Sequence, residues 1–444
     1  MTTLLTASKL IISMLFLGRM GSIELAGGSL AIAFANVSGI SVMKGLSVAM
    51  DPICSQAYGA KRWSILGQTY IKTFLLLVLA SLPISLLWLN VEHIFALFGQ
   101  DPTITKVAKV YLVYSLPELL AQAHLHPLRS FLRTQNLNSP ATIVATCTTI
   151  LHLPITYLLV THLRLGVKGI ALTSVFYTFN MNIGLLIYIV TSKVAIKPWV
   201  DATLVSTFQG WGPLLCLAFP SACSVCLEWW WYEIILFLGG LLSNPQSTVG
   251  ALGVLIQTIS VIYAVPHSLN VSISQRVGHE LGAGEALRAQ RAAIIGITIG
   301  LLYGLFAFCL TIVLRSVWGK LYTSNPETLA LIAASLPLIG LAEVGNAPQT
   351  AACGVLIGSA RPKVGVRVNL TSFYLIGLPV AVLLAFVLDF GFLGLWWGLV
   401  ASQLSCVVMM LCTVYQTDWK DQTRRAEELT LAAGEEDVVT NLVA

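Results

Sequence analysis

The sequence predicts an all-α, polytopic membrane protein in which twelve transmembrane helices form two pseudo-symmetric six-helix lobes. Composition, the spacing of apolar runs and an internal repeat support this class. Of the 444 residues, 56% are hydrophobic and only 10% are charged, whereas soluble domains carry about 25% charged residues. The mean hydropathy is +0.82. A chain of this length has room for roughly twelve spans of about 20 residues, but not for a large soluble domain as well.

Apolar runs between polar, proline and glycine breaks predict the helices in order. The first six fall at residues 1–17, 27–57, 64–90, 105–133, 139–160 and 167–192. The second six fall at residues 209–241, 248–280, 288–315, 328–356, 363–387 and 392–415. The domains are then an N-lobe at 1–192 with a shortened first helix, a cytoplasmic linker at 193–208, a C-lobe at 209–416 and a cytoplasmic tail at 417–444.

Basic residues predict the orientation of this map. When the loops are assigned alternately to the two sides, lysine and arginine favour one side by roughly two to one, and the positive-inside rule makes that side cytoplasmic. Both termini then lie in the cytosol, because the number of spans is even. The polar composition after Tyr415 predicts a solvated, partly helical tail.

An internal repeat links the two halves. Landmarks of the first half recur in the same order, and at a nearly constant offset, in the second half. The pairs are QAYGAK at 56–61 with HELGAG at 279–284, QDP at 100–102 with SNP at 324–326, SLP at 115–117 with SLP at 335–337, Pro140 with Pro362, and GVKG at 166–169 with GFLG at 391–394. Six helices per half make this a parallel repeat, which predicts alternating access by rocking of the two lobes.

Acidic residues inside the predicted spans are candidates for function. They are Asp51, Glu118, Glu228, Glu233 and Glu343. A charge at the bilayer centre costs about 2.5 to 3.5 kcal/mol on insertion scales, so a retained acid usually faces a wet cavity or a partner. Glu343 is a second candidate for proton handling, because Gly345 and Pro348 loosen its helix. For Glu118, a buried contact with Arg129 or a nearby histidine is the plainer explanation.

The seventh predicted helix carries the densest cluster, CLEWWWYEI at 226–234. Its aromatic residues are Trp229, Trp230, Trp231 and Tyr232. The functional interpretation is a cation site in which Glu228 and Glu233 supply charge and the aromatic faces supply cation–π attraction. On a straight helix the two acids are turned about 140° apart and cannot point at one spot. The alternative is an interfacial aromatic belt with snorkelling acids.

A carboxyl group desolvated among tryptophans can exchange between its protonated and charged forms near neutral pH. Proton and cationic substrate would then compete for the same oxygen atoms, which is the basis of antiport. One pH unit supplies about 1.4 kcal/mol for this exchange.

Other chemistries find little support. The nine cysteines stand singly in apolar stretches without a CxxC pair, which favours packing over disulfides or a metal site. His124 and His126, two residues apart, do not share a helical face, so zinc binding is not expected. An intramembrane enzyme would rely on these histidines and Glu118, and no nucleophile lies at a helpful spacing. We therefore expect no enzyme, no metal and no cofactor beyond a coupling ion.

The motifs QAYGAKRW, CLEWWWYE, RVGHELGAG and GVLIGSARPKVGVRVNL resemble those of the multidrug and toxic compound extrusion (MATE) family, over nearly the whole chain. The runs LAEVGNAPQTAACGVLIGSARP and SMLFLGRMGSIELAGGSLA are most similar to its plant, DETOXIFICATION-like branch. The resemblance implies two lobes around a central cavity. It also implies export of organic cations, secondary metabolites, hormones or organic acids against protons or sodium, with coupling acids on the seventh and tenth helices. On the seventh helix these fall on Glu228 and Glu233.

The chain departs from the family pattern at several positions. Asn346 stands where many eukaryotic members have the tenth-helix acid, with Glu343 one turn earlier, and Gln349 follows on the same helix. Ile357 replaces the usual Arg, and His279 the usual Asn. The first helix begins late, which implies either a truncated gene model or a helix that barely spans.

The function expected from the sequence is therefore a secondary active antiporter exporting cationic or neutral organic compounds in exchange for protons. A sodium-coupled exporter and a lipid-linked flippase are the alternatives. The expected partners are a small organic substrate and the lipid bilayer, with no nucleic acid, and the protein is expected to be a monomer. We expect a multi-pass protein of the plasma membrane or of an endomembrane (vacuolar, Golgi or late endosomal).

Overall fold

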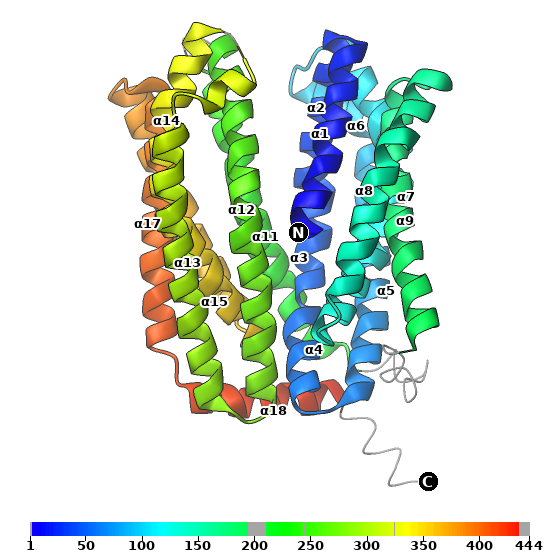
Figure 1. Ribbon diagram of the computed structural model, residues 1–444, viewed down its shortest axis with the longest axis vertical. Helices are drawn as coiled ribbons and strands as arrows, with labels where there is room; N and C mark the ends of the chain where they lie inside the picture. The colour runs from blue at the N-terminus through cyan, green and yellow to red at the C-terminus, as the bar shows by residue number, and fades with distance from the viewer. Residues whose placement is uncertain (1, 194–209, 243–244, 324, 435–444) are drawn as a thin grey trace. The chain divides into compact units, whose positions relative to one another are not determined.

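The computed structural model describes residues 2–193, 210–242, 245–323 and 325–434 and is helical, with no strand among those residues (Figure 1). The predicted linker at 193–208 lies outside the described residues except for Lys193. Residues 435–444 of the predicted tail lie outside them as well.

The first half of the chain forms helices that match the first six predicted spans. They are α1 (Thr2–Met20), α2 (Ser22–Ala35), α3 (Ser41–Val48), α4 (Met50–Gly59), α5 (Trp63–Leu89), α6 (Val91–Leu97), α7 (Pro102–Thr134), α8 (Ser139–Tyr157) and α9 (Val167–Ser192). Helices α2 to α4 belong to one continuous span, Ile23–Gly59, which contains a π-helical stretch at Asn36–Ile40. The short α6 is an extra element between the third and fourth spans.

The second half follows the same plan. Its helices are α11 (Gly212–Gly240), α12 (Pro245–Gly282), α13 (Ala286–Leu314), α14 (Pro326–Gly358), α15 (Pro362–Asn369), α16 (Leu378–Val382), α17 (Gly391–Tyr415) and α18 (Trp419–Gly434). Helices α15 and α16 form one span, Pro362–Val387, with π-helical segments at Leu370–Gly377 and Leu383–Val387.

Ten of the described helical segments are long and apolar enough to cross a membrane. Helix α1 adds the shorter apolar stretch Ile11–Met20. Helix α7 is 33 residues long, enough to span, but its apolar character is broken by Lys106, Lys109, Glu118, Arg129 and Arg133. With α1 and α7 the segments number the predicted twelve, and the predicted fold class is confirmed.

The repeated landmarks have matching structural roles. Asp101 and Asn325 are the N-caps of α7 and α14, and each side chain accepts from two backbone N–H groups of the first turn. Left-handed backbone conformations recur at Lys61 and Gly284, Asn136 and Ala360, Arg164 and Asp389, and Gly166 and Gly391.

The caps also correct one of the predicted pairs. When Asp101 is made equivalent to Asn325, Pro117 corresponds to Leu341 and not to Pro337. The two SLP motifs are therefore about one helical turn out of register, and pairing them was wrong. The kinks that these prolines allow lie at different levels of α7 and α14.

Contacts within the chain divide it into two compact units. The first comprises Met1–Cys54, Arg62–Ala222 and Leu431–Ala444, and the second comprises Ser55–Lys61 and Cys223–Thr430. These bounds differ from the predicted lobes at three places: the start of α11 and the end of the chain group with the first unit, and Ser55–Lys61 groups with the second. In the first unit the core packs around Trp88 and Leu112. In the second it packs around Trp231, Phe373 and Trp396.

Within the second unit, small residues bring α14 into close contact with its neighbours. A Cβ added at Gly304 of α13 would lie 2.6 Å from the Glu343 carbonyl oxygen. A Cβ added at Gly354 of α14 would lie 2.3 Å from the Asn270 carbonyl oxygen of α12. Such close approach is typical of helix packing in membranes, where small residues allow backbones to meet.

The repeated Gly-Ala motifs pack against each other, also within the second unit. A Cβ at Gly59 would lie 2.1 Å from the His279 carbonyl oxygen, and a Cβ at Gly282 would lie 1.9 Å from that of Gln56. Gln56 and His279 occupy equivalent positions of the repeat, so the contact has local two-fold symmetry. His279, noted as a departure from the family pattern, stacks on Tyr58 with ring centroids 4.6 Å apart.

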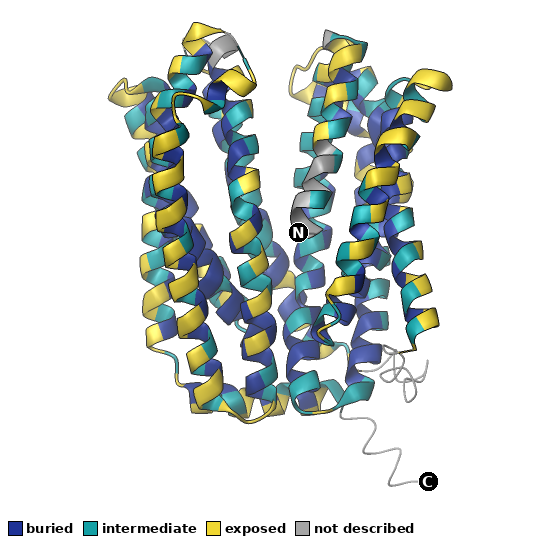
Figure 2. Ribbon diagram, in the orientation of Figure 1, coloured by how far each residue is buried: buried dark blue, intermediate teal, exposed yellow. Residues whose placement is uncertain are grey.

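Large apolar side chains are exposed on helices of both units, and Figure 2 marks the exposed residues of these helices in yellow. On α13, for example, Leu302 is 61% exposed and Phe306 is 59% exposed. Side chains of this kind are expected to face lipid, because exposed apolar surface of this extent is unusual in water.

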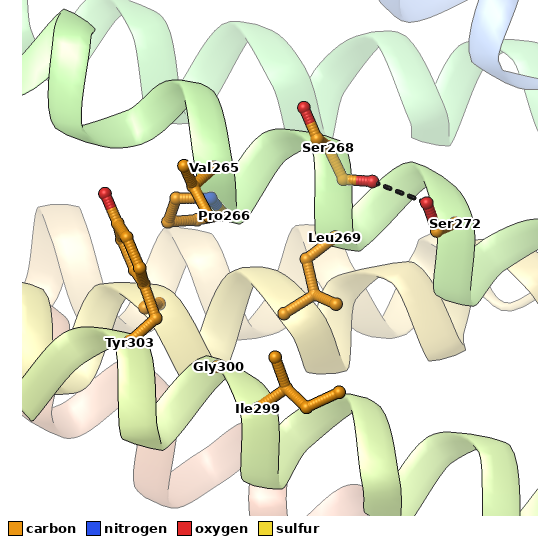
Figure 3. A pocket seen from close by; sticks show the side chains of 9 residues that line it. Val265, Pro266, Ser268, Leu269, Ser272, Ile299, Gly300 and Tyr303 are labelled. Carbon is orange, nitrogen blue, oxygen red and sulfur yellow. Dashed lines mark hydrogen bonds between the residues drawn. The ribbon is translucent and has the colours of Figure 1, made fainter. Parts of the chain in front are cut away.

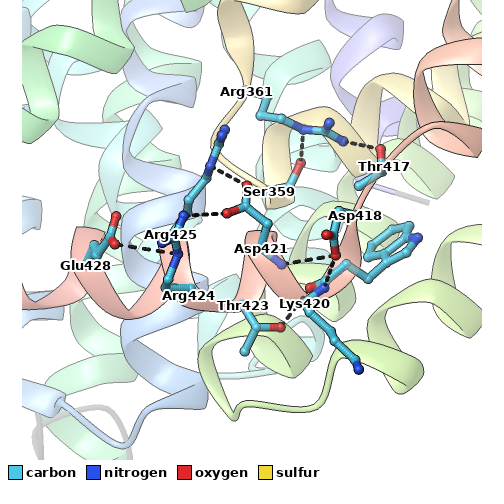
Figure 4. Close-up of polar contacts among 11 residues, drawn as sticks. Ser359, Arg361, Thr417, Asp418, Lys420, Asp421, Thr423, Arg424, Arg425 and Glu428 are labelled. Atoms are coloured by element: carbon cyan, nitrogen blue, oxygen red, sulfur yellow. Dashed lines mark hydrogen bonds and ion pairs between the residues drawn. The ribbon is translucent and has the colours of Figure 1, made fainter.

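Helix α18 forms part of the predicted tail and packs its apolar face on the second unit, where Trp419 and Ala426 are buried. Its outer face carries ion pairs, among them Arg424 and Arg425 with Asp421 at 2.6 and 2.8 Å (Figure 4). Arg361 donates to Thr417 at 2.9 Å. Burial, and to a smaller extent Arg425, lowers the pKa of Arg361 to about 10.

Candidate functional site

Glu343 lies at the centre of a buried polar network in the second unit. Its side chain is on α14, the residue is 3% exposed, and Asn346 Nδ2 donates to both carboxyl oxygens at 3.0 Å. The Asn346 oxygen in turn accepts from Thr350 at 3.2 Å and from Gln349 at 3.4 Å. The sequence candidates on this helix, Glu343, Asn346 and Gln349, therefore form one connected group.

Neighbouring helices extend this network. Cys406 of α17 donates to Gln349 at 3.5 Å, and Asn270 of α12 donates to the Thr350 carbonyl oxygen at 2.7 Å. Asn369 of α15 binds the carbonyl oxygen of Ser224 on α11 at 3.1 Å. The polar groups of α11, α12, α14, α15 and α17 thus meet around the tenth predicted span.

The two acids of α11 separate, as their positions around the helix predict. Glu228 lies on the face turned to the network, because its charge and that of Glu343 both act on the hydroxyl groups of Tyr232 and Tyr263. Glu233 is turned away from that face and is only partly buried. The structure therefore brings Glu228 and Glu343 into one electrostatic environment, without Glu233.

The predicted aromatic residues also divide. Trp231 is fully buried in the hydrophobic core and packs against Phe373 with ring centroids 5.8 Å apart. Trp230 is 38% exposed and lies about 160° around α11 from Glu228 and from Tyr232. Trp229 is partly buried. Tyr232 is the aromatic residue of this group that belongs with the acids, since both carboxyl charges act on its hydroxyl.

Gln403 of α17 and Tyr263 of α12 are members of this site that the sequence reasoning missed. Gln403 is 1% exposed, and its amide faces the Tyr232 hydroxyl without a hydrogen bond of ordinary geometry. A polar side chain within an apolar span is the signal that could have identified Gln403, since such residues are rare and usually face the interior.

The first unit holds Glu118 in a different setting. Lys9 of α1 forms an ion pair with its Oε1 at 2.5 Å, and Thr178 of α9 donates to the same atom at 3.1 Å. The expectation of an arginine or histidine partner was wrong. His124 instead bonds Tyr70 at 2.8 Å and Asn182 at 2.9 Å.

Asp51 is also compensated. Arg133 donates to its two oxygens at 2.9 and 3.1 Å, and Ser130 donates to Oδ1. Both carboxylate oxygens of Asp51 are therefore engaged, one of them by a guanidinium and a hydroxyl together. The geometry therefore favours a structural role for Asp51.

A cavity of about 250 Å³ lies between α12 and α13 in the second unit (Figure 3), and none of the predicted site residues lines it. It borders Pro266, which cannot donate a hydrogen bond to the carbonyl oxygen of Ile262. The Tyr303 hydroxyl donates to that oxygen at 2.9 Å instead. Within the described residues, no three His, Cys, Asp or Glu side chains are grouped to hold a metal ion.

A polytopic helical protein with an internal repeat and a buried membrane acid has the features of a secondary transporter. Comparison with known proteins identifies the family. The MatE family model matches residues 1–158 and 220–383. The chain is 57% identical to Protein DETOXIFICATION 53 of Arabidopsis thaliana over 98% of this chain and 90% of the relative. It is 49% identical to Protein DETOXIFICATION 49 of the same plant, over 98% and 88%.

Solved structures agree. The crystal structure of the eukaryotic MATE transporter AtDTX14 matches with a TM-score of 0.90 and 32% identity, covering 97% of this chain and 96% of that one. The Vibrio cholerae MATE transporter VcmN, in its bent form, shares the fold with a TM-score of 0.79 at 18% identity, over 96% and 95%. The chain belongs to the MATE family of membrane transporters, as its sequence motifs indicate.

Proposed function

We propose that this protein is a secondary active antiporter that exports cationic or neutral organic compounds in exchange for protons, with Glu343 as the proton carrier. The observation that carries the proposal is the setting of Glu343. It is 3% exposed inside a span, and among the described residues its hydrogen bonds come from the Asn346 amide and from no cation.

A buried carboxyl group without a countercharge is stable mainly in its neutral form, because ionisation at membrane depth costs about 2.5 to 3.5 kcal/mol or more. Release of its proton therefore needs either water or a positively charged substrate nearby. This makes proton and organic cation competitors for one site, which is the thermodynamic requirement for exchange. A pH difference of one unit across the membrane supplies about 1.4 kcal/mol of free energy for each proton exchanged for a substrate molecule.

Glu228 is proposed as the second acid of this site. The Tyr232 and Tyr263 hydroxyls lie within the field of both Glu228 and Glu343, so a cation entering here would meet two carboxyl groups and aromatic faces. Glu233, on another face of α11, is proposed to contribute less. This differs from the sequence expectation, which placed coupling on Glu228 and Glu233.

Transport of ethidium into proteoliposomes tests the proposal. In sodium-free buffer with an imposed pH gradient, we expect Glu343→Gln and Glu228→Gln to reduce gradient-driven transport at least about tenfold, since each removes a titrating group. Glu233→Gln should retain most of the rate. Glu285→Gln is the matched control, because Glu285 lies at the start of α13 with its side chain 50% exposed.

Counterflow without a gradient separates coupling from folding. Glu343→Gln should still exchange labelled for unlabelled ethidium, at higher ethidium concentrations than the parent, because Glu228 and the aromatic faces remain to bind the cation while the group that takes up and releases the proton is lost. Parent-like gradient-driven transport by Glu343→Gln would remove Glu343 from the mechanism. A sodium gradient that drives the parent protein better than a pH gradient would favour the sodium-coupled alternative.

The remaining assignments are proposals of the same kind. We propose a monomer in the plasma membrane or an endomembrane. We also propose that both termini are cytosolic, and this orientation rests on the distribution of lysine and arginine among the loops. Accessibility labelling of a cysteine introduced after Gly434, in intact against permeabilised cells, tests the orientation.

A further inference from the structure

A second charged cluster lies in the first unit, at the C-terminal end of α7. His126, Arg129 and Arg133 occupy one stripe of this helix, since residues three and four apart share a face. The charge of Lys44 on α3 acts on His126 together with those of both arginines. We call Lys44, His126, Arg129 and Arg133 the basic cluster.

Among the described residues, an acid pairs with only one of the two arginines of the basic cluster. Asp51 pairs with Arg133 at 2.9 Å. Glu118 lies eleven residues earlier on α7 than Arg129, roughly 16 Å along the helix axis, and is already paired with Lys9. The stripe therefore carries two permanent guanidinium charges, of which only that of Arg133 is paired with a carboxylate.

Three members of the basic cluster, His126, Arg129 and Arg133, have side-chain nitrogen atoms without a hydrogen-bond partner among the described residues. In the part of the chain that the structure describes, the Arg129 guanidinium makes no hydrogen bond or ion pair, and the permanent charge that acts on it is that of Arg133. Arg133 Nε and His126 Nε2 are buried without a hydrogen-bond partner. Arginine has five N–H donors, and leaving buried donors of a charged group unpaired is costly.

An interfacial explanation accounts for only part of this. Basic side chains at helix ends often extend to the lipid headgroups, but the unpaired atoms of His126 and Arg133 are shielded within the unit. The residues beside them on α7, among them Leu128, Phe131 and Leu132, are buried as well. The unpaired donors point to a ligand that enters the cluster.

We propose that the basic cluster is an oxyanion-binding site, in which Arg129 and Lys44, supported by Arg133 and His126, bind a carboxylate or phosphate group. The group would belong either to a soluble organic anion or to a lipid headgroup. Guanidinium and ammonium groups together suit both oxyanions, because the planar arginine fork matches their oxygen geometry and the lysine adds a point charge. The site is separate from the acidic network and does not depend on the proposed proton coupling.

Ligand-dependent thermal stability of the purified full-length protein tests this inference. In phosphatidylcholine nanodiscs at constant ionic strength, inorganic phosphate or benzoate should raise the unfolding temperature saturably, relative to chloride. We expect Arg129→Gln to weaken the apparent affinity at least about tenfold, the equivalent of about 1.4 kcal/mol, and Arg129→Lys to weaken it less. Arg288→Gln is the matched control, because Arg288 is 65% exposed at the start of α13.

A second arm distinguishes the source of the anion. If a lipid headgroup is the ligand, nanodiscs with added phosphatidylglycerol should raise the unfolding temperature of the parent protein more than that of Arg129→Gln. If the ligand is soluble, free phosphate or benzoate should show this difference between the parent and the variant. Either result supports the site. Equal stabilisation of the parent and Arg129→Gln by every probe overturns it. Should Arg129→Gln fail to fold, Lys44→Gln takes its place with the same expected loss. The assay needs no gradient, so its outcome is separate from that of the ethidium experiment.

Discussion

Two lysine–glutamate pairs of the first unit provide an internal test of how burial sets the strength of an ion pair. Lys9 and Glu118 are 2.5 Å apart with side chains 18% and 12% exposed. Lys109 and Glu92 are 2.6 Å apart with side chains 38% and 37% exposed. The distances are nearly equal, so a difference in energy would reflect the surroundings. We predict that the inner pair couples strongly and the outer pair weakly.

The expected magnitudes follow from desolvation. Removing one partner of a buried pair leaves an uncompensated charge and costs about 3 to 5 kcal/mol. Lys9→Met and Glu118→Gln should each destabilise the protein by an amount near the lower end of that range. The double variant should lie within about 1 kcal/mol of the parent, because a glutamine can still accept from Thr178. For Lys109→Met and Glu92→Gln, the coupling should be about 0 to 1 kcal/mol.

Unfolding in mixed dodecylmaltoside and dodecyl sulfate micelles, followed by circular dichroism, gives the free energies for both double-mutant cycles. Equal coupling energies for the inner and outer pairs would refute the reasoning. The same inner double variant should transport ethidium at near the parent rate under a pH gradient. A large loss of gradient-driven transport in that stable variant would instead place Glu118 among the coupling residues.

Three further predictions concern local structure. Tyr303→Phe should destabilise the protein by about 1 kcal/mol, because the Ile262 carbonyl oxygen loses its hydroxyl donor beside Pro266. Gly304→Ala should destabilise it by about 1 to 3 kcal/mol, because the added methyl group would overpack against α14. The free energy of unfolding of both variants is measured in the same mixed micelles. The backbone N–H groups of Thr103 and Ile104 hold the pKa of Asp101 below its usual value. The cap is therefore present above about pH 4 and weakens as pH falls through the folded pKa, which hydrogen exchange at the start of α7 will detect.

Each of these predictions has a matched control in the chain. Tyr322→Phe should change stability little, since within the described residues the Tyr322 hydroxyl makes no hydrogen bond. Gly253→Ala should be neutral or slightly stabilising, because no atom lies within 4 Å of the added Cβ. Asp101→Asn should keep the cap and lose its pH dependence, as Asn325 does for α14. Equal effects in a variant and its control would contradict the corresponding explanation.

The features that could be predicted from sequence are those set by local chemistry. Apolar length marks a span, and Asp-Pro and Asn-Pro mark helix starts, since the side chain caps the helix and proline suits its first turn. The offset between Glu228 and Glu233 follows from helical geometry alone. What could not be predicted depends on contacts between distant segments. Lys9 meets Glu118 although the two are far apart in the sequence, and the Gln403 amide of α17 faces the Tyr232 hydroxyl of α11 across a similarly long stretch of chain.

The equivalence of α7 and α14 explains why the two halves differ in chemistry. In the register set by their caps, Glu118 corresponds to Ala342, directly beside Glu343, so each half carries one buried acid at nearly the same level of its equivalent helix. In the first unit, α1 supplies Lys9, which forms an ion pair with Glu118. In the second unit, α11 supplies Tyr232 near Glu343, and Asn346 supplies an amide. A hydroxyl and an amide can serve both the protonated and the charged carboxyl group, whereas an ammonium group stabilises only the charged form. The repeated backbone therefore presents two similar acids in different surroundings, and this difference is why the proposed function assigns proton exchange to the second.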